Sequence, residues 1–307
     1  MTIRSLLLPL DGSDLAESAL PAAAYLARLF GASVTLVHVI EQGARNRVHR
    51  SRHLTQPLEA NRYLKEAAAR FLPEEIIVKR HVHEAAVRNV ARSIAEHARE
   101  LRTDLIILCA HGSGGPRDWL IGNIAQQVIA QGPTPVLLLR PEAPPTTDAP
   151  YSIRSILLPL DGVPAHERGV ALAEEIAAKC GAAVHLATVV PTPGTLAGEL
   201  AAAGRLLPGS TAALLDLTGE EARAFLEQQG NRISKNGISV TTQVLRGDPA
   251  DELAGLANHP QDDLIVLGTH GKAGSTAFWN RSVAARVLGK IKIPALLIPV
   301  GESRKRE

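Results

Sequence analysis

The stretch IRSLLLPLDG at residues 3–12 returns as IRSILLPLDG at residues 153–162, with nine of ten positions identical. Two further pairs recur in the same order, DLIILCAHG at 104–112 with DLIVLGTHG at 263–271, and TPVLLLRP at 134–141 with IPALLIPV at 293–300. Ordered internal similarity of this kind is typical of a duplicated unit. The sequence therefore predicts two domains of one fold.

The spacing of these blocks predicts the domain boundaries. The offset between the copies grows from 150 to 159 residues, so the second copy carries a net insertion, which we place in the apolar, Gly- and Pro-rich loop at 191–210. Four prolines between the copies predict a semi-rigid linker. The expected parts are a first domain at 1–140, a linker at 141–152, a second domain at 153–300 and a charged tail at 301–307.

Short apolar runs alternate with longer stretches of helical period, which indicates βαβ units around a parallel sheet. In the first copy we expect strands at 3–9, 33–40, 76–82, 105–110 and 136–140, and helices at 14–30, 58–72, 85–101 and 120–131. In the second copy we expect strands at 153–159, 183–190, 238–245, 264–269 and 295–299. The predicted fold class is α/β, with two tandem, doubly wound, Rossmann-like domains that each hold a five-stranded parallel sheet.

Composition excludes several classes of protein. The 33 basic and 31 acidic side chains leave a net charge of +2, which gives no bulk attraction to nucleic acid or to a membrane surface. No apolar stretch approaches the roughly 20 residues that a membrane helix needs. The two cysteines, Cys109 and Cys180, are too few for a disulfide framework and have no metal-site spacing. These features favour a soluble protein of the reducing cytoplasm.

Polar and glycine residues follow the first and fourth strands, where ligands of open parallel sheets bind. Asp11 and Gly12 follow the first strand, and the fourth is followed by His111, Gly112, Gly122 and Asn123. Glycine lets backbone amides approach phosphate oxygens, and a carboxylate accepts hydrogen bonds from a ribose hydroxyl or an adenine amino group. The alternative is that the glycines form turns and that Asp11 forms a turn or caps a helix.

At these residues the sequence resembles the universal stress protein family, whose nucleotide-binding members carry G-x-x-G, nine residues and G-[ST] after strand four. In the first copy Gly112 and Gly122 match, while Cys109 replaces the first glycine and Asn123 replaces Ser or Thr. The side chain of Cys109 either obstructs a ligand or points into the core. The resemblance therefore implies that the first copy is a binding site whose sequence differs from the family motif at two positions.

The second copy departs from the motif at a more sensitive position. Gly268, Gly271 and Ser282 match, but Arg281 stands where the third glycine belongs. Arg281 either blocks the phosphates or contacts them, and we expect obstruction and a degenerate site. The resemblance also implies an adenine-side acid at Asp11 and Asp161, and backbone contacts to adenine at Val39 and Val189.

The resemblance implies strand order 3-2-1-4-5 and ATP as the ligand of the binding branch. The expected function is a cytoplasmic tandem universal stress protein that binds ATP through its first domain as a stress-response or energy-state module. The alternatives are a nucleotide-free dimerisation or interaction protein and a slow ATPase. No catalytic residue is assigned, and no motif of protein ligands supports a bound Mg²⁺.

Family members pair through their last strands. We therefore expect the strands at 136–140 and 295–299 to pair within one chain as a pseudo-dimer, with a homodimer of two chains left open.

Three other features have weaker functional interpretations. A basic cluster follows the second strand, where it either reaches phosphates or forms a solvated, mobile loop: Arg45, Arg47, His49, Arg50, Arg52 and His53. His111 and His270 are interpreted as structural because no partner residues orient them as bases. The stretches RGDPADELAGLA at 246–257 and HVHEAAVRNVA at 81–91 are both interpreted as helix starts, with Asp248 as an N-cap.

Overall fold

The computed structural model describes residues 2–43, 47–48, 51–52, 54–110, 123–140, 151–162, 167–196, 198–259, 261–270 and 282–300. The chain forms two compact units. The first contains residues 1–152, joined by 269–279 and 294–307, and the second contains 153–268 and 280–293. The predicted linker, apart from residues 151 and 152, and the predicted tail lie outside the described residues.

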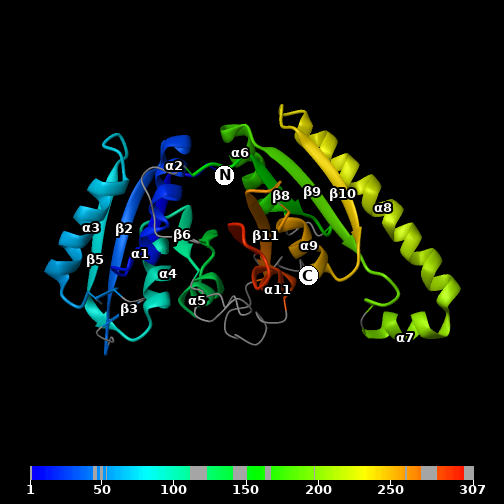
Figure 1. The fold of residues 1–307 in the computed structure, drawn as a ribbon, viewed down its shortest axis with the longest axis horizontal. Coiled ribbons are helices and arrows are strands. Elements are labelled where there is room, and N and C mark those ends of the chain that lie inside the picture. Colours follow the sequence, from blue (N-terminus) through cyan, green and yellow to red (C-terminus); the bar gives the residue numbers. More distant parts are fainter. Residues whose placement is uncertain are drawn as a thin grey trace, which may run out of the picture. The chain divides into compact units, whose positions relative to one another are not determined.

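The first repeat forms a five-stranded parallel sheet (Figure 1). Its strands are β1 (Ser5–Pro9), β2 (Ser33–Glu41), β5 (Val78–Val87), β6 (Leu105–Cys109) and β7 (Val136–Leu139). They lie in the order β5-β2-β1-β6-β7, which is 3-2-1-4-5 in sequence terms and confirms the predicted topology. The runs at β1, β6 and β7 are continuously apolar because helices cover both faces of a doubly wound sheet.

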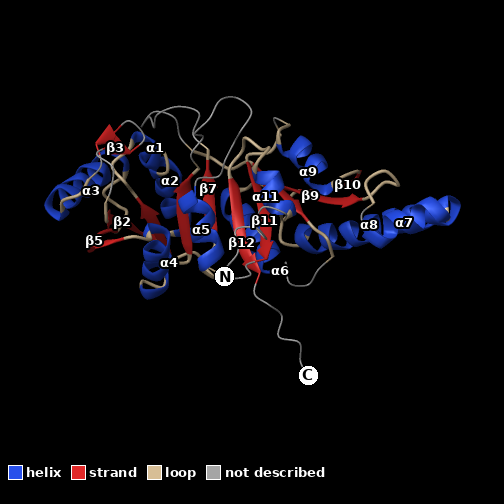
Figure 2. Ribbon diagram, turned by 90° about the horizontal axis from the view of Figure 1, so that it is seen from below, coloured by secondary structure: helices blue, strands red, loops and turns tan. Residues whose placement is uncertain are grey.

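Five helices connect these strands, and Figure 2 shows them on either side of the sheet. They are α1 (Asp14–Glu17), α2 (Leu20–Phe30), α3 (Pro57–Phe71), α4 (Val90–Glu100) and α5 (Asn123–Gln131). Helix α2 packs on α3, and α4 packs on α5. A two-stranded hairpin, β3 (Arg47–Val48) with β4 (Ser51–Arg52), precedes α3.

Two predicted helices of the first repeat have different bounds in the structure. The predicted helix at 14–30 is divided into α1 and α2, because Pro21 has no N–H to donate and its ring clashes with the preceding turn, so it stands at the start of a new helix. The predicted helix at 85–101 begins only at Val90, because β5 continues to Val87. The prediction that residues 81–91 start a helix was therefore wrong for most of its length.

The second unit repeats the pattern with four parallel strands. They are β8 (Ser155–Pro159), β9 (Ala183–Val190), β10 (Val240–Arg246) and β11 (Leu264–His270), in the order β10-β9-β8-β11. Helix α6 (Glu167–Cys180) packs on β8 and β9, while α9 (Pro249–Ala257) packs on β9 and on α11 (Val283–Leu288). The Asp248 carboxylate accepts hydrogen bonds from two backbone amides of α9, which confirms the predicted N-cap.

The insertion in the second repeat is helical. The predicted apolar loop at 191–210 contains α7 (Gly198–Leu206), and α8 (Pro208–Ser234) begins within it. Helix α8 runs along β10 (Figure 1), and its buried positions include Leu226, Gly230 and Ile233. A Cβ atom at Gly230 would stand 3.3 Å from Thr242, so the helix approaches the strand closely. The loop prediction was wrong: α7 packs against α8, and α8 packs on β9 and β10 farther along its length.

The last strand, β12 (Ala295–Val300), belongs to the first unit, where it runs antiparallel to β7. Leu296 pairs with Leu137, and Leu297 pairs with Val136. All four of these side chains are buried, so the pairing removes an apolar edge from solvent. Among the described residues, no helix is both long enough and apolar enough to cross a membrane.

Candidate functional site

A cavity lies at the carboxyl ends of β1, β2 and β6 in the first unit. Its volume is about 790 Å³, its open mouth included. β1 and β6 are neighbours in the sheet, and the strand order reverses between them, which is where ligands of open parallel sheets bind. The strand residues that line it are Pro9, Leu10, Asp11, Val37, His38, Val39, Glu41, Leu108 and Cys109.

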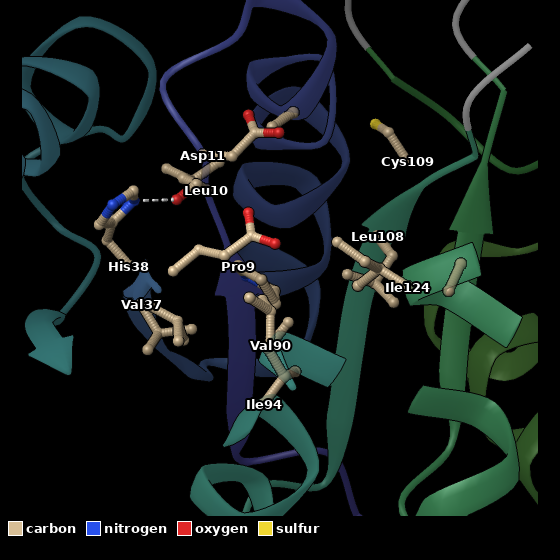
Figure 3. Close-up of a pocket in the computed structure, with 14 residues that line it drawn as sticks. Pro9, Leu10, Asp11, Val37, His38, Val90, Ile94, Leu108, Cys109 and Ile124 are labelled. Atoms are coloured by element: carbon tan, nitrogen blue, oxygen red, sulfur yellow. Dashed lines mark hydrogen bonds between the residues drawn. The ribbon is translucent and has the colours of Figure 1, made fainter. Parts of the chain in front are cut away.

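Three helices complete the described wall of this cavity. Ala16 comes from α1, Val90 and Ile94 come from α4, and Ile124 and Ala125 come from α5. Figure 3 shows Asp11 and Cys109 at one end of the pocket and Val90 and Ile94 at the other. The wall is mostly aliphatic, with the Asp11 and Glu41 carboxylates as its charged groups and no Lys or Arg among the described lining residues. A flat, neutral, largely apolar group fits such a wall better than an anion does.

Asp11 has a structural role at the rim of the cavity. Its Oδ1 accepts hydrogen bonds from the Ser13 amide at 3.0 Å and from the Ser13 hydroxyl at 2.6 Å. The Ser13 hydroxyl in turn accepts a bond from the amide of Ala16 and caps α1. Gly12 turns the chain with φ of +90°, a region that glycine adopts at little cost. The interpretation of Asp11 as a turn residue is therefore confirmed, and Oδ1 is the carboxylate oxygen that accepts the hydrogen bonds of the turn.

His38 fixes the backbone beside Asp11. Its ring is 2% exposed, with Nδ1 2.7 Å from the Leu10 carbonyl oxygen and Nε2 2.9 Å from that of Leu54. Figure 3 marks the bond to Leu10. His38 lies in the apolar strand sequence VTLVHVI, and both of its ring nitrogens have a backbone carbonyl oxygen within hydrogen-bond distance, as expected of a histidine buried in a strand. The tautomer decides which ring nitrogen donates.

Cys109 ends β6 at the cavity and is 7% exposed. Burial, reinforced by the charge of Asp11, raises the pKa of its thiol to about 12. Val39 is also 7% exposed and lines the wall from β2. Cys109 is therefore a buried residue that also lines the cavity. The sequence left open whether its side chain obstructs a ligand or points into the core, and its position has features of both alternatives.

The structure brings Asp11, Val39 and Cys109 together around one cavity. The remaining predicted positions of the first site, His111, Gly112 and Gly122, lie outside the described residues, as does the side chain of Asn123, whose backbone begins α5. In the basic cluster, Arg47 and Arg52 pair through their backbones in the β3–β4 hairpin, and their side chains are not described. Arg45, His49, Arg50 and His53 lie outside the described residues altogether.

The second unit has a similar strand end with different details. Asp161 is exposed after β8, and Gly162 has φ of +74°. The Thr188 hydroxyl donates to the Leu160 carbonyl at 2.7 Å, as His38 binds Leu10 in the first unit. Val189 and Gly268 are half-buried in β9 and β11, and Gly271 and Arg281 lie outside the described residues. The Ser282 hydroxyl caps α11 by accepting a bond from the Ala285 amide.

A model of the universal stress protein family matches residues 2–140 and again residues 152–299. This chain belongs to the universal stress protein family. A universal stress protein of Methanocaldococcus jannaschii is 29% identical over 149 residues, which are 47% of this chain and 81% of that protein. One from Thermus aquaticus is 30% identical over 142 residues, which are 45% of this chain and 98% of that protein.

A solved universal stress protein from Archaeoglobus fulgidus matches with a TM-score of 0.65 at 15% identity, over 99% of this chain and 98% of that one. The likeness is to the tandem arrangement, and at this identity it shows the fold alone. The tandem repeat and the α/β fold predicted from the sequence are thereby confirmed.

The lining of this universal stress protein's cavity includes residues that sequence reasoning missed. Glu41, Val90, Ile94 and Ile124 follow no motif, because three different elements bring them to the cavity. Tyr63, on α3, is a further neighbour, since its pKa is raised by burial and by the charges of Asp11 and Asp14. Only the rule that ligands bind at the carboxyl ends of neighbouring parallel strands could have located this group of residues.

Proposed function

We propose that the first repeat binds ATP in the cavity between β1, β2 and β6, and that the chain acts in the cytoplasm as a stress-response or energy-state module. The observation that carries the proposal is the pairing of an aliphatic cavity with a carboxylate at its rim. Cys109, the first position of the family motif, lines the same cavity.

Each part of an adenine nucleotide has a counterpart here. The base would lie among Val39, Leu108 and Ile124, and the second carboxylate oxygen of Asp11 would accept a bond from the ribose or the amino group. The phosphates would lie away from Asp11 and Glu41, against the glycine-containing segment that starts at Gly112 and ends at Asn123. This division keeps the phosphate charge apart from the carboxylates of the cavity.

The first test is to identify nucleotides released from the denatured, freshly purified protein and to titrate ATP by calorimetry. We expect about one ATP per chain. Gly122→Arg, which copies the residue at Arg281, should abolish binding, and Arg281→Gly should raise the stoichiometry toward two. An absence of both released nucleotide and titration heat would favour the nucleotide-free branch of the family.

A variant of the described site gives a graded result. Asp11→Asn retains an oxygen for the Ser13 amide and removes the charge, so we expect ATP affinity to fall roughly tenfold, as for a lost hydrogen bond to a charged group. Asp161→Asn is the matched control in the second repeat and should leave affinity unchanged. Equal effects of the two substitutions would contradict the assignment of the site to the first repeat.

Assembly is a separate part of the proposal. We infer that the antiparallel pairing of β7 with β12 is the pseudo-dimer contact, which within one chain takes the place of pairing between two chains. Sedimentation of the intact protein tests this inference, and a monomer at micromolar concentration is the expected result. A stable homodimer would show that a second interface exists.

A further inference from the structure

Three histidines outside the cavity come together in the first unit. His81 and His83 lie on β5, and His97 lies on α4. Residues two apart on a strand point to the same face, which is why both strand histidines face the helix. One nitrogen from each ring can be chosen so that all three lie within 4.8 Å of one another. The interpretation of residues 81–91 as a helix start does not predict this cluster.

The rings are close to the spacing of metal ligands. His97 Nε2 stands 3.1 Å from His83 Nδ1, and the centroids of the His81 and His97 rings are 4.5 Å apart. In a tetrahedral zinc site with Zn–N bonds of about 2.0–2.1 Å, the donor atoms stand about 3.3 Å apart. Two of the three nitrogens are therefore close to this separation, and the third lies within 4.8 Å of them.

His81 supplies an independent indication of a ligand. Its Nε2 is fully buried and has no hydrogen-bond partner among the described residues. A buried polar atom without a partner is costly, and a metal ion would satisfy it.

The ring of His97 is oriented by Glu100. The Glu100 Oε2 lies 3.3 Å from His97 Nδ1, one helical turn farther along α4. A metal-binding histidine commonly donates its second N–H to a carboxylate in this way, which leaves the other nitrogen for the ion. Here the nitrogen that remains is Nε2, the atom that faces His83.

We propose that His81, His83 and His97 form a three-histidine site for a divalent transition metal, with Zn²⁺ as the preferred ion. Imidazole ligands suit Zn²⁺, Ni²⁺ and Cu²⁺, whereas Mg²⁺ and Ca²⁺ require oxygen ligands. Three nitrogens leave a fourth tetrahedral position for water. The ion would join the edge strand β5 to α4, whose Ile94 lines the cavity. The site does not rest on nucleotide binding.

The second repeat has none of these ligands. In the strand register, Gln243 and Leu245 occupy the places of His81 and His83, since they pair with Ala187 and Val189 as the histidines pair with Val37 and Val39. Leu256 stands eight residues after the N-cap of α9, as His97 does after the N-cap of α4. The proposal therefore predicts one site per chain.

The test uses the full chain after removal of metal with a chelator. Zn²⁺ is titrated by calorimetry, and Co²⁺ is titrated while its visible absorption is recorded, because tetrahedral Co²⁺ with nitrogen ligands gives intense bands. We expect one ion per chain, with the intense Co²⁺ bands. Failure of wild type to bind either ion, or Co²⁺ binding with only the weak bands of an octahedral ion, would overturn the proposal.

Variants assign the ligands. His83→Gln and His97→Gln should each weaken Zn²⁺ binding at least a hundredfold, while His259→Gln, at an exposed histidine of the second unit, should have no effect. Glu100→Gln should weaken binding roughly tenfold. Glu100 is 63% exposed, so this variant should fold even if a histidine variant does not. Unchanged binding in folded His83→Gln or in Glu100→Gln would place the ion elsewhere and contradict the proposal.

Discussion

At the scale of single residues, the two cysteines have different environments. Cys109 is buried at the end of β6, and the pKa of its thiol is raised to about 12. Cys180 ends α6 and is partly exposed, and neither residue forms a disulfide. Because the thiolate is the reactive form, the burial that shapes the cavity also protects Cys109 from reagents.

We predict that the native protein has one fast and one slow thiol toward a disulfide reagent at pH 8. At this pH roughly one Cys109 in ten thousand would be ionised, whatever its accessibility. Cys180→Ser should remove the fast phase, and the fully denatured protein should show two thiols of similar rate. A fast phase that persists in Cys180→Ser would mean that Cys109 is accessible and ionised.

At the scale of elements, the helix that follows the third strand begins differently in the two repeats. In the second repeat, Asp248 caps α9 and also binds both terminal nitrogens of Arg286 on α11, at 2.6 and 3.1 Å. The hydrogen bond from Arg286 is the main cause that lowers the pKa of Asp248. In the first repeat Asn89 caps α4 instead. The carboxylate of Asp248 thus joins α9 to α11, whereas the corresponding cap of α4 is the uncharged Asn89.

We predict that Asp248→Ala lowers the free energy of unfolding of the second unit by about 1 kcal/mol at pH 7, the usual value of a lost N-cap. Asp248→Asn keeps a capping oxygen and should lose less. The measurement is urea unfolding followed by circular dichroism. An equal loss in both variants would show that the charge contributes more than the cap.

The stabilising charge of Asp248 should also be visible in the pH dependence. A carboxyl group with a lowered pKa in the folded state stabilises above its unfolded value of about 3.9, and the contribution disappears as the pH falls through the folded value. The difference between wild type and Asp248→Asn should therefore be constant from pH 7 to about 5 and shrink below pH 4. A difference that grows on acidification would contradict the lowered pKa.

At the scale of the whole molecule, the last strand of the chain completes the sheet of the first unit. β12 covers the edge of β7, whose four residues, Val136–Leu139, are all buried. An exposed apolar edge strand pairs readily with other chains. The C-terminal strand of the second repeat therefore covers an apolar edge strand of the first unit.

We predict that a chain ending at residue 293, which lacks β12, self-associates. The matched control ends at residue 300, so that it loses the tail at 301–307 but keeps β12. Sedimentation at several concentrations should show association that rises with concentration in the first protein and none in the control. Identical sedimentation of the two truncated proteins would contradict the inference that β12 protects the edge of β7 from self-association.

Much of the fold could be predicted from local pattern. Strands buried on both faces are continuous apolar runs, and these located β1, β2, β6 and β7 almost to the residue. The pattern located only the first half of β5, an edge strand whose sequence VKRHVHEAAV is polar because one edge and much of its surface are open. It failed at residues 191–210, where α7 packs against α8 and the composition indicated a loop.

For the candidate site, Asp11 was predicted because it follows a strand at the carboxyl edge of the sheet, whereas Val39 and Cys109 were implied by the resemblance to the universal stress protein family. The sequence could not predict Ile94 or Ile124, whose positions depend on how α4 and α5 pack over that edge. The sequence contains His81, His83 and His97, but it does not indicate that they meet, because the spacing of 14 residues between His83 and His97 matches no local motif.

The sequence by itself determined the duplication, the α/β class and the strand ends at which a ligand would bind, because these depend on short-range repetition and periodicity. The tertiary structure alone decided which side chains meet in the lining of the cavity and in the three-histidine cluster. The physical reason is that side-chain proximity across elements depends on packing between segments far apart in the chain, and no local pattern records that packing.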